Sequence, residues 1–227
     1  MANLHLFSSP GRDDIRYIIE AARAYLEHKT NATVAYLPFA SLYAERWQEV
    51  TEDSFKGLAQ IETLNAETMS LPEMEDIVRR ASVVYISGGN TFLLGHRLHV
   101  SKLMPFLRKK VQAGLPVVAF SAGTVLCGPN ILTSEDMNTV ETSHFDGLNA
   151  TPFNFLSHYP LDDYGQAMKD AWLADYHFFH DNPVIMLSDG ACVKVDGKKA
   201  VLVRGDAWIL RKDQEKEKLE AGRLIAV

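Results

Sequence analysis

The chain has 227 residues, of which 47% are hydrophobic and 23% charged, with a formal net charge of −6 and a pI near 5.7. This length suits one large α/β domain over residues 1–227, and the acidic balance excludes a broad nucleic-acid surface, which needs clustered Lys and Arg. With only two cysteines, no leader-like N-terminus and no apolar run of about 20 residues, we expect a cytoplasmic protein without membrane partners.

Short apolar strands alternate with helices through the first half of the chain. In chain order, we expect a strand at 3–7, a helix at 13–28, a strand at 33–39, a helix at 47–57, a weaker strand at 59–65, a helix at 72–80, a strand at 82–87, helices at 92–98 and 101–113, and a strand at 117–120. The strands are rich in β-branched residues without polar alternation, which is typical of strands buried on both faces. The pattern therefore predicts a mostly parallel sheet with helices on both faces.

The second half is less regular. A polar, turn-rich stretch at 130–151 is followed by a strand-like run at 153–160, a long helix at 162–179 and strand-like runs at 184–190, 191–203 and 207–212. The Asp196-Gly197 step suits a tight two-residue turn, so we expect a C-terminal β-hairpin. The charged run 211–222 is expected to be a solvated surface segment.

Ser121 stands where the strand 117–120 ends and a helix begins, in the sequence AFSAGT. Ligands of parallel α/β sheets bind at this edge, and the residue that follows, Ala122, offers a backbone N–H. The small neighbours are similar to the nucleophile elbow G-x-S-x-G, with Ala119 in place of the first glycine. On this stretch alone, a serine that only N-caps the helix is slightly favoured.

A second strand also ends in small residues, in the sequence SGGNT at Ser87–Thr91. Glycines allow positive φ angles and expose backbone N–H groups to an anion. Two strand ends of this kind can converge on a developing oxyanion, although a generic tight turn explains Gly88 and Gly89 equally well.

No cofactor or metal is expected. Neither G-x-G-x-x-G nor G-x-x-x-x-G-K-[ST] occurs in the chain, which weakens a phosphate-binding interpretation. His177 and His180 lie three residues apart, but no carboxylate or cysteine completes a zinc spacing, so a surface or capping role is favoured for them.

A serine nucleophile needs a base, and the base needs an orienting acid. His158 ends the strand-like run 153–160 just after the polar stretch, and His144 within that stretch is its competitor. Asp136 and the adjacent Glu135 are the candidate acids, and either could merely be solvated.

Several motifs together resemble one family. SGGNTFLL, FSAGTVLCGPNI, EDMNTV and NFLSHYP occur in the order and at the spacings of peptidase E, the aspartyl dipeptidase family of serine peptidases, and the tail SDGACVKVDGKKAVLV resembles that family's C-terminal hairpin. The resemblance covers most of the chain and implies a flavodoxin-like, class I glutamine amidotransferase-like fold. It implies an enzyme that hydrolyses short peptides, in particular dipeptides with N-terminal Asp. We expect a monomer or a homodimer. The oxyanion donors that it implies are the backbone N–H groups of Gly89 and Ala122.

Carried over by residue, the resemblance implies Ser121 as nucleophile and His158 as general base. It implies Asp136 as the triad acid, with Glu135 as the fallback. The preference for aspartate would require a cation for the substrate carboxylate and an acceptor for its α-amine, and no motif identifies either.

The chain departs from the family pattern at Ala119, where glycine is usual, and at Ser157, where proline commonly precedes the histidine. These departures keep open a catalytically silent binding protein with the same fold. A cysteine-dependent, amidotransferase-like hydrolase is a further alternative, although Cys127 lies within the helix after Ser121, where packing is favoured over exposure.

Overall fold

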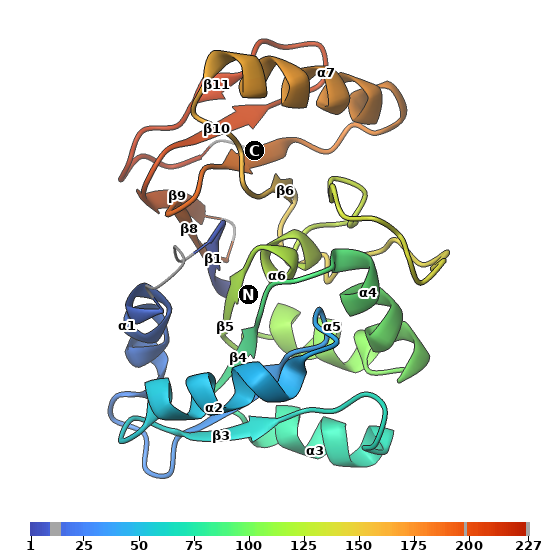
Figure 1. Ribbon diagram of the computed structural model, residues 1–227. Coiled ribbons are helices and arrows are strands. Elements are labelled where there is room, and N and C mark those ends of the chain that lie inside the picture. Colours follow the sequence, from blue (N-terminus) through green and yellow to red (C-terminus); the bar gives the residue numbers. More distant parts are fainter. Residues whose placement is uncertain (10–14, 198, 226–227) are drawn as a thin grey trace.

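The computed structural model in Figure 1 describes residues 1–9, 15–197 and 199–225. Its larger sheet has the strand order β3-β2-β4-β5-β1-β8-β9. The strands of this sheet are β1 (Asn3–Phe7), β2 (Thr33–Leu37), β3 (Gln60–Thr63), β4 (Val83–Ile86), β5 (Val117–Phe120), β8 (Cys192–Asp196) and β9 (Lys199–Arg204). The first five are parallel, whereas β8 and β9 form an antiparallel hairpin on β1. The predicted mostly parallel sheet and C-terminal hairpin are therefore confirmed.

Helices cover both faces of this sheet. One face packs against α1 (Arg16–Leu26) and α2 (Ala44–Phe55), and its core includes Tyr85 and Val118. The other face packs against α3 (Leu71–Arg80), α4 (Thr91–Val100), α5 (Met104–Gln112) and the short α6 (Ala122–Leu126). Successive strand residues point to opposite faces, so strands covered on both sides must be apolar throughout, as the sequence indicated.

A second, four-stranded sheet lies at the other end of the molecule, with the order β11-β10-β7-β6 (Figure 1). Its elements are β6 (Asn154–Leu156), β7 (Val184–Leu187), β10 (Ala207–Leu210) and β11 (Glu217–Lys218). The long helix α7 (Asp163–Phe179) covers one face, where Leu173 and Tyr176 pack beside Met186 and Trp208. The opposite face, with Ile185 and Ile209, joins the core of the larger sheet.

This second sheet differs from the sequence-based expectation. The runs 184–190 and 207–212 pair with each other as β7 and β10. The run 191–203 instead contributes to β8 and β9 of the larger sheet. The charged run 211–222, expected to be only a solvated segment, contributes β11 to the edge of β10. Strand pairing is a long-range property that short apolar runs do not encode by themselves.

Several element boundaries also shift. The helix expected at 101–113 begins only at Met104, because Lys102 adopts φ 62°, which interrupts the helical conformation between α4 and α5. The helix expected at 47–57 begins earlier, at Ala44, and the expected start at residue 13 lies outside the described residues. The run 153–160 shortens to β6, so that Ser157 and His158 follow the strand. Within the described ranges, no helix combines the length and apolar character of a membrane span.

Candidate active site

Ser121 connects β5 to α6 in a strained backbone conformation, with φ 51° and ψ −117°. Its N–H donates to the carbonyl oxygen of Phe7 at 3.0 Å, which ties the turn to β1. The side chain makes no capping hydrogen bond, and an N-capping residue adopts the β region instead. The Ser121 side chain therefore does not cap the helix, and the N-cap interpretation is wrong. A backbone strain of about 1–3 kcal/mol persists only where the surrounding structure enforces it, typically at functional sites.

Two glycines let the strand ends approach each other. A Cβ at Gly123 would lie 2.5 Å from the carbonyl oxygen of Ile86, so the turn after Ser121 can press against β4 only without a side chain. Gly89 has φ +137°, and a Cβ there would lie 2.3 Å from the carbonyl oxygen of Ala40. Gly89 and Ala122, whose N–H groups the sequence suggested as oxyanion donors, line the same pocket as Ser121.

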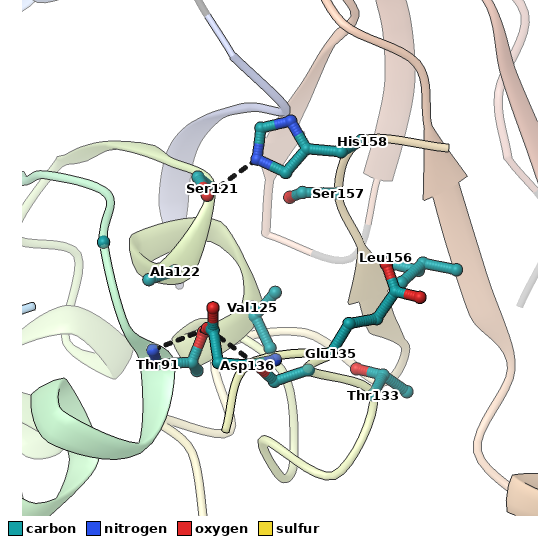
Figure 2. Close-up of a pocket in the computed structure, with 12 residues that line it drawn as sticks. Thr91, Ser121, Ala122, Val125, Thr133, Glu135, Asp136, Leu156, Ser157 and His158 are labelled. Carbon is teal, nitrogen blue, oxygen red and sulfur yellow. Dashed lines mark hydrogen bonds between the residues drawn. The ribbon is translucent and has the colours of Figure 1, made fainter. Parts of the chain in front are cut away.

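His158 lies directly beside Ser121, as expected from its place at a strand end. The distance from Ser121 Oγ to His158 Nε2 is 3.0 Å (Figure 2). The histidine has φ 60°, and its backbone N–H donates to Ser8 Oγ at 2.7 Å. The next residue, Tyr159, donates its N–H to the carbonyl oxygen of Leu187 at 2.9 Å. The backbone at His158 and Tyr159 is thus fixed, once to the side chain of Ser8, which follows β1, and once to Leu187 of β7.

The carboxylate on the other side of the imidazole belongs to Asp189, which was not a candidate from the sequence. Asp189 Oδ1 lies 2.6 Å from His158 Nδ1, in the turn that leads from β7 to β8. The hydroxyl of the buried Ser8 lies 3.3 Å from the same Oδ1 and donates to it. Ser8 therefore bridges the backbone of His158 and the side chain of Asp189.

Asp136 and Glu135, the expected acids, have other partners. Asp136 Oδ2 accepts from the backbone N–H and the hydroxyl of Thr91, both at 2.7 Å, and from Ser134 Oγ at 2.9 Å (Figure 2). This places Asp136 at the first turn of α4, where the helix dipole stabilises negative charge. Glu135 pairs with Lys169 of α7. The carboxylate in contact with His158 is therefore that of Asp189, whereas the side chains of Asp136 and Glu135 are held by other groups.

The remaining nucleophile and base candidates lie away from Ser121. His144 stacks on His99, with ring centroids 4.3 Å apart. Cys127 is buried, its thiol lies 3.3 Å from the carbonyl oxygen of Gly123, and burial raises its pKa to about 12. A thiol that stays protonated near neutral pH is a poor nucleophile, which argues against the cysteine-dependent alternative.

A surface or capping role was favoured for the histidine pair near the end of α7, and His180 is the half-buried C-cap residue of that helix. His177 is buried, and its Nδ1 lies 3.3 Å from the carbonyl oxygen of His180. In the part of the chain that the structure describes, no group of three or more His, Cys, Asp or Glu side chains is arranged to hold a metal ion.

A pocket of about 220 Å³ opens beside Ser121. Its walls come from both sheets and from the polar stretch between them (Figure 2). The lining residues are Gly89, Thr91, Ser121, Ala122, Val125, Thr133, Ser134, Glu135, Asp136, Leu156, Ser157 and His158.

The two departures noted in the sequence fit this geometry. Ala119 lies inside β5, paired with Leu6 and Ile86, so its extended backbone does not require glycine. Ser157 lies in the pocket wall, and the preceding β6 and the anchors on either side of His158 fix its place.

Comparison with known proteins gives three consistent results. The sequence pattern of Peptidase family S51 matches residues 4–203. A protein of Drosophila melanogaster named "Probable alpha-aspartyl dipeptidase" is 32% identical over 211 residues, covering 88% of this chain and 86% of that protein. A "Peptidase E" of Pasteurella multocida (strain Pm70) is 28% identical over 227 residues, with 95% of each chain covered. The crystal structure of a peptidase from an acI-B1 Actinobacterium shares the fold, with a TM-score of 0.75 at 19% identity over 100% of this chain and 97% of that one.

Proposed function

Because the chain belongs to peptidase family S51, we propose that it is a serine-type dipeptidase with Ser121 as nucleophile, His158 as general base and Asp189 as the acid. The observation that carries the proposal is the unbroken chain of contacts from Ser121 Oγ to His158 Nε2, at 3.0 Å, and from His158 Nδ1 to Asp189 Oδ1, at 2.6 Å. A nucleophile, a base and an orienting carboxylate in this order define the triad arrangement on unrelated folds.

The proton positions follow from the partners. A carboxylate accepts hydrogen bonds only, so His158 Nδ1 carries the proton and donates it to Asp189. Nε2 is then free to accept from the Ser121 hydroxyl. This is the tautomer in which the imidazole acts as a base toward the serine.

The reaction is acyl transfer to water. Ser121 Oγ attacks the peptide carbonyl carbon while His158 Nε2 takes the serine proton, and Asp189 stabilises the imidazolium that forms. The backbone N–H groups of Gly89 and Ala122 stabilise the oxyanion. The C–N bond then breaks as His158 gives its proton to the leaving amine, and a water molecule, deprotonated by the same Nε2, hydrolyses the acyl-enzyme.

The pocket supports the restriction to short peptides. The Asp136 carboxylate lies on the pocket wall below Ala122 and Ser121 (Figure 2). Three donors occupy its Oδ2, which fixes the carboxylate in place at the pocket wall. A fixed carboxylate suits the free α-ammonium of a substrate whose first residue fills the pocket, and this contact selects peptides with a free N-terminus.

The test compares wild type with Ser121→Ala. We expect wild type to hydrolyse dipeptides and to be labelled at Ser121 by a fluorophosphonate probe, and the variant to do neither. Hydrolysis retained by Ser121→Ala would rule out the serine mechanism, and a folded wild type that is neither labelled nor active would indicate the silent binding protein. The cytoplasmic location and the monomeric or homodimeric state belong to the same proposal, and cell fractionation and size-exclusion chromatography test them.

A further inference from the structure

We infer that Arg97 is a positioning residue for the oxyanion turn, defined here as residues 88–91. From α4, its guanidinium group holds the segment 39–41 against the backbone of Gly89. This inference rests on the proposed function, because it concerns a backbone N–H group that the proposal assigns to the oxyanion. Arg97 lies outside the described lining of the pocket, so it acts through the main chain of the segment 39–41.

The oxyanion turn is supported by the carbonyl group of Ala40. Glycine is the least restricted residue of a backbone, so the Gly89 N–H keeps one direction only if its neighbours are fixed. The carbonyl oxygen of Ala40 accepts from the N–H of Asn90 at 2.8 Å. The same oxygen lies against Gly89, where a Cβ would approach it to 2.3 Å. The direction of the Gly89 N–H therefore depends on where the buried Ala40 lies.

Arg97 fixes the chain on both sides of Ala40. Its Nη1 donates to the carbonyl oxygen of Phe39 at 3.0 Å and to that of Ser41 at 2.7 Å. Nη1 carries two N–H bonds, so this one nitrogen can serve both carbonyl groups. The Arg97 side chain is only 15% exposed, and hydrogen bonds from a charged donor are stronger than neutral ones. A shift of Ala40 would therefore break at least one strong hydrogen bond.

These contacts close a ring through the protein. Thr91 ends the oxyanion turn and begins α4, and Arg97 follows less than two helical turns later. The start of this helix is itself capped, because Asn90 Oδ1 accepts from the N–H of Leu93 at 2.9 Å. The ring runs from the turn along α4 to Arg97, across to the segment 39–41, and back to the turn. Donors that are held in place before the reaction are those that stabilise an oxyanion best.

The contact of Arg97 with Glu67 provides an internal control. Arg97 Nη2 lies 2.6 Å from Glu67 Oε1, and the Glu67 side chain is 57% exposed. Exposed ion pairs contribute little to stability. If Arg97 served only this ion pair, removal of either partner would have the same effect. If it positions the oxyanion turn, only the loss of Arg97 should affect the reaction.

The experiment measures kcat and KM for whichever of Asp-Leu, Asn-Leu and Ala-Leu wild type hydrolyses fastest. Arg97→Met keeps an unbranched side chain without donors and should lower kcat about 10- to 100-fold, with KM changed less than threefold. This is less than the roughly 10²- to 10³-fold loss for a deleted oxyanion donor, because the Gly89 N–H remains in the chain. Arg97→Lys has a shorter side chain that reaches at most one of the two carbonyl groups, so kcat should fall about threefold to tenfold. Glu67→Gln should retain the wild-type kcat.

A boronic acid inhibitor distinguishes positioning from a loss of stability. In an α-aminoboronic acid with the first side chain of that dipeptide, boron accepts a lone pair from Ser121 Oγ, the serine proton passes to His158, and a tetrahedral adduct forms. Its boron-bound oxygen lies where the oxyanion would form. The inhibition constant should therefore rise for Arg97→Met by about the factor by which kcat falls. Partial unfolding would lower kcat through the active fraction and leave the inhibition constant unchanged.

Three results would overturn the inference. They are a wild-type kcat in Arg97→Met (or in Arg97→Lys, where circular dichroism shows Arg97→Met to be unfolded), an equal loss of kcat in Glu67→Gln, and an unchanged inhibition constant. Each leaves the dipeptidase proposal intact, because wild type still hydrolyses a dipeptide.

Failure of the proposed function has a different signature. A wild type that is labelled at Ser121 by a fluorophosphonate but hydrolyses none of the three dipeptides overturns the dipeptidase proposal. The rate of labelling then decides the role of Arg97, because the phosphonyl oxygen also occupies the oxyanion turn: labelling at least tenfold slower in Arg97→Met supports the inference, and an unchanged rate overturns it. A folded wild type that is neither labelled nor active overturns both.

Discussion

Asp189→Asn keeps the shape of the side chain and removes one negative charge from the far side of His158. The two atoms in contact lie 2.6 Å apart. For full charges at that distance, the attraction is about 1.6 kcal/mol at the dielectric constant of water and about 6 kcal/mol at an effective value of about 20. The side chains of His158 and Asp189 are 49% and 64% exposed, so the lower part of this range applies. A loss of about 2–4 kcal/mol in the transition state corresponds to a roughly 30- to 1000-fold lower kcat.

The assay determines kcat and KM separately for the preferred dipeptide, with Asp136→Asn as the matched control. The imidazolium forms only during the reaction, so Asp189→Asn should lower kcat while KM changes little. Asp136→Asn removes the partner proposed for the substrate α-ammonium and should mainly raise KM. Thermal unfolding of both variants shows that each remains folded.

The opposite pattern would refute this reasoning. If Asp189→Asn retained more than a third of the wild-type kcat while Asp136→Asn lost more than 100-fold in kcat, the acid would be Asp136 and the contact at His158 Nδ1 would have no catalytic role.

Four other outcomes are expected. Ser8→Ala removes the bridge between His158 and Asp189 and should lower kcat about fivefold to tenfold, with KM changed less than twofold. Ser8→Thr keeps the hydroxyl and should restore kcat. A loss of stability without a loss of kcat would contradict the positioning role of Ser8. Gly89→Ala should lose at least 100-fold in activity, because its Cβ would lie 2.3 Å from the Ala40 oxygen at φ +137°, and an unchanged kcat would exclude the proposed oxyanion turn. Iodoacetamide at pH 8 should leave activity intact, because burial raises the pKa of the Cys127 thiol to about 12, and rapid inactivation would favour a cysteine nucleophile. Burial, with a smaller contribution from Lys194, lowers the pKa of His5 from 6.5 to about 4. The unfolded chain therefore binds this proton first as the pH falls, and stability to urea should decrease as the pH drops from about 6.5 towards 4. His5→Gln should make this decrease smaller.

The family resemblance predicted the proposed nucleophile and base, because the local sequence alone slightly favoured an N-capping serine at Ser121 and left His144 as a competitor of His158. Ser121 and His158 both stand where an apolar run ends, and the structure places them 3.0 Å apart. Asp189 carries the same signal, since it follows the buried strand β7 and precedes a glycine. Asp136 and Glu135 lie nearer to His158 in the sequence, but their carboxylates contact Thr91 and Lys169 instead. Proximity in sequence was a poor guide, because the chain reaches Asp189 only after crossing α7 and β7.

Most of the larger sheet was predictable for a similar reason. Strands buried on both faces leave a strong apolar pattern, and the helices between them leave a periodic one. The partition of the last strands was not predictable, because β7 and β8 are separated by only four residues and yet belong to different sheets. Their pairing partners, β10 and β1, lie on opposite sides of them in the sequence, and local composition does not distinguish the two.

The proposed reactive groups are distributed over two sheets, so the site forms only when the two sheets are docked. Ser121 and Ser8 follow strands of the larger sheet, whereas His158 follows β6 of the smaller one, and Asp189 lies in the connection between them. A partly folded molecule in which the sheets have not docked holds the serine without its base. In a denaturant titration, we expect hydrolysis to be lost no later than the far-ultraviolet circular dichroism signal, because the contact between Ser121 and His158 requires both sheets to be docked.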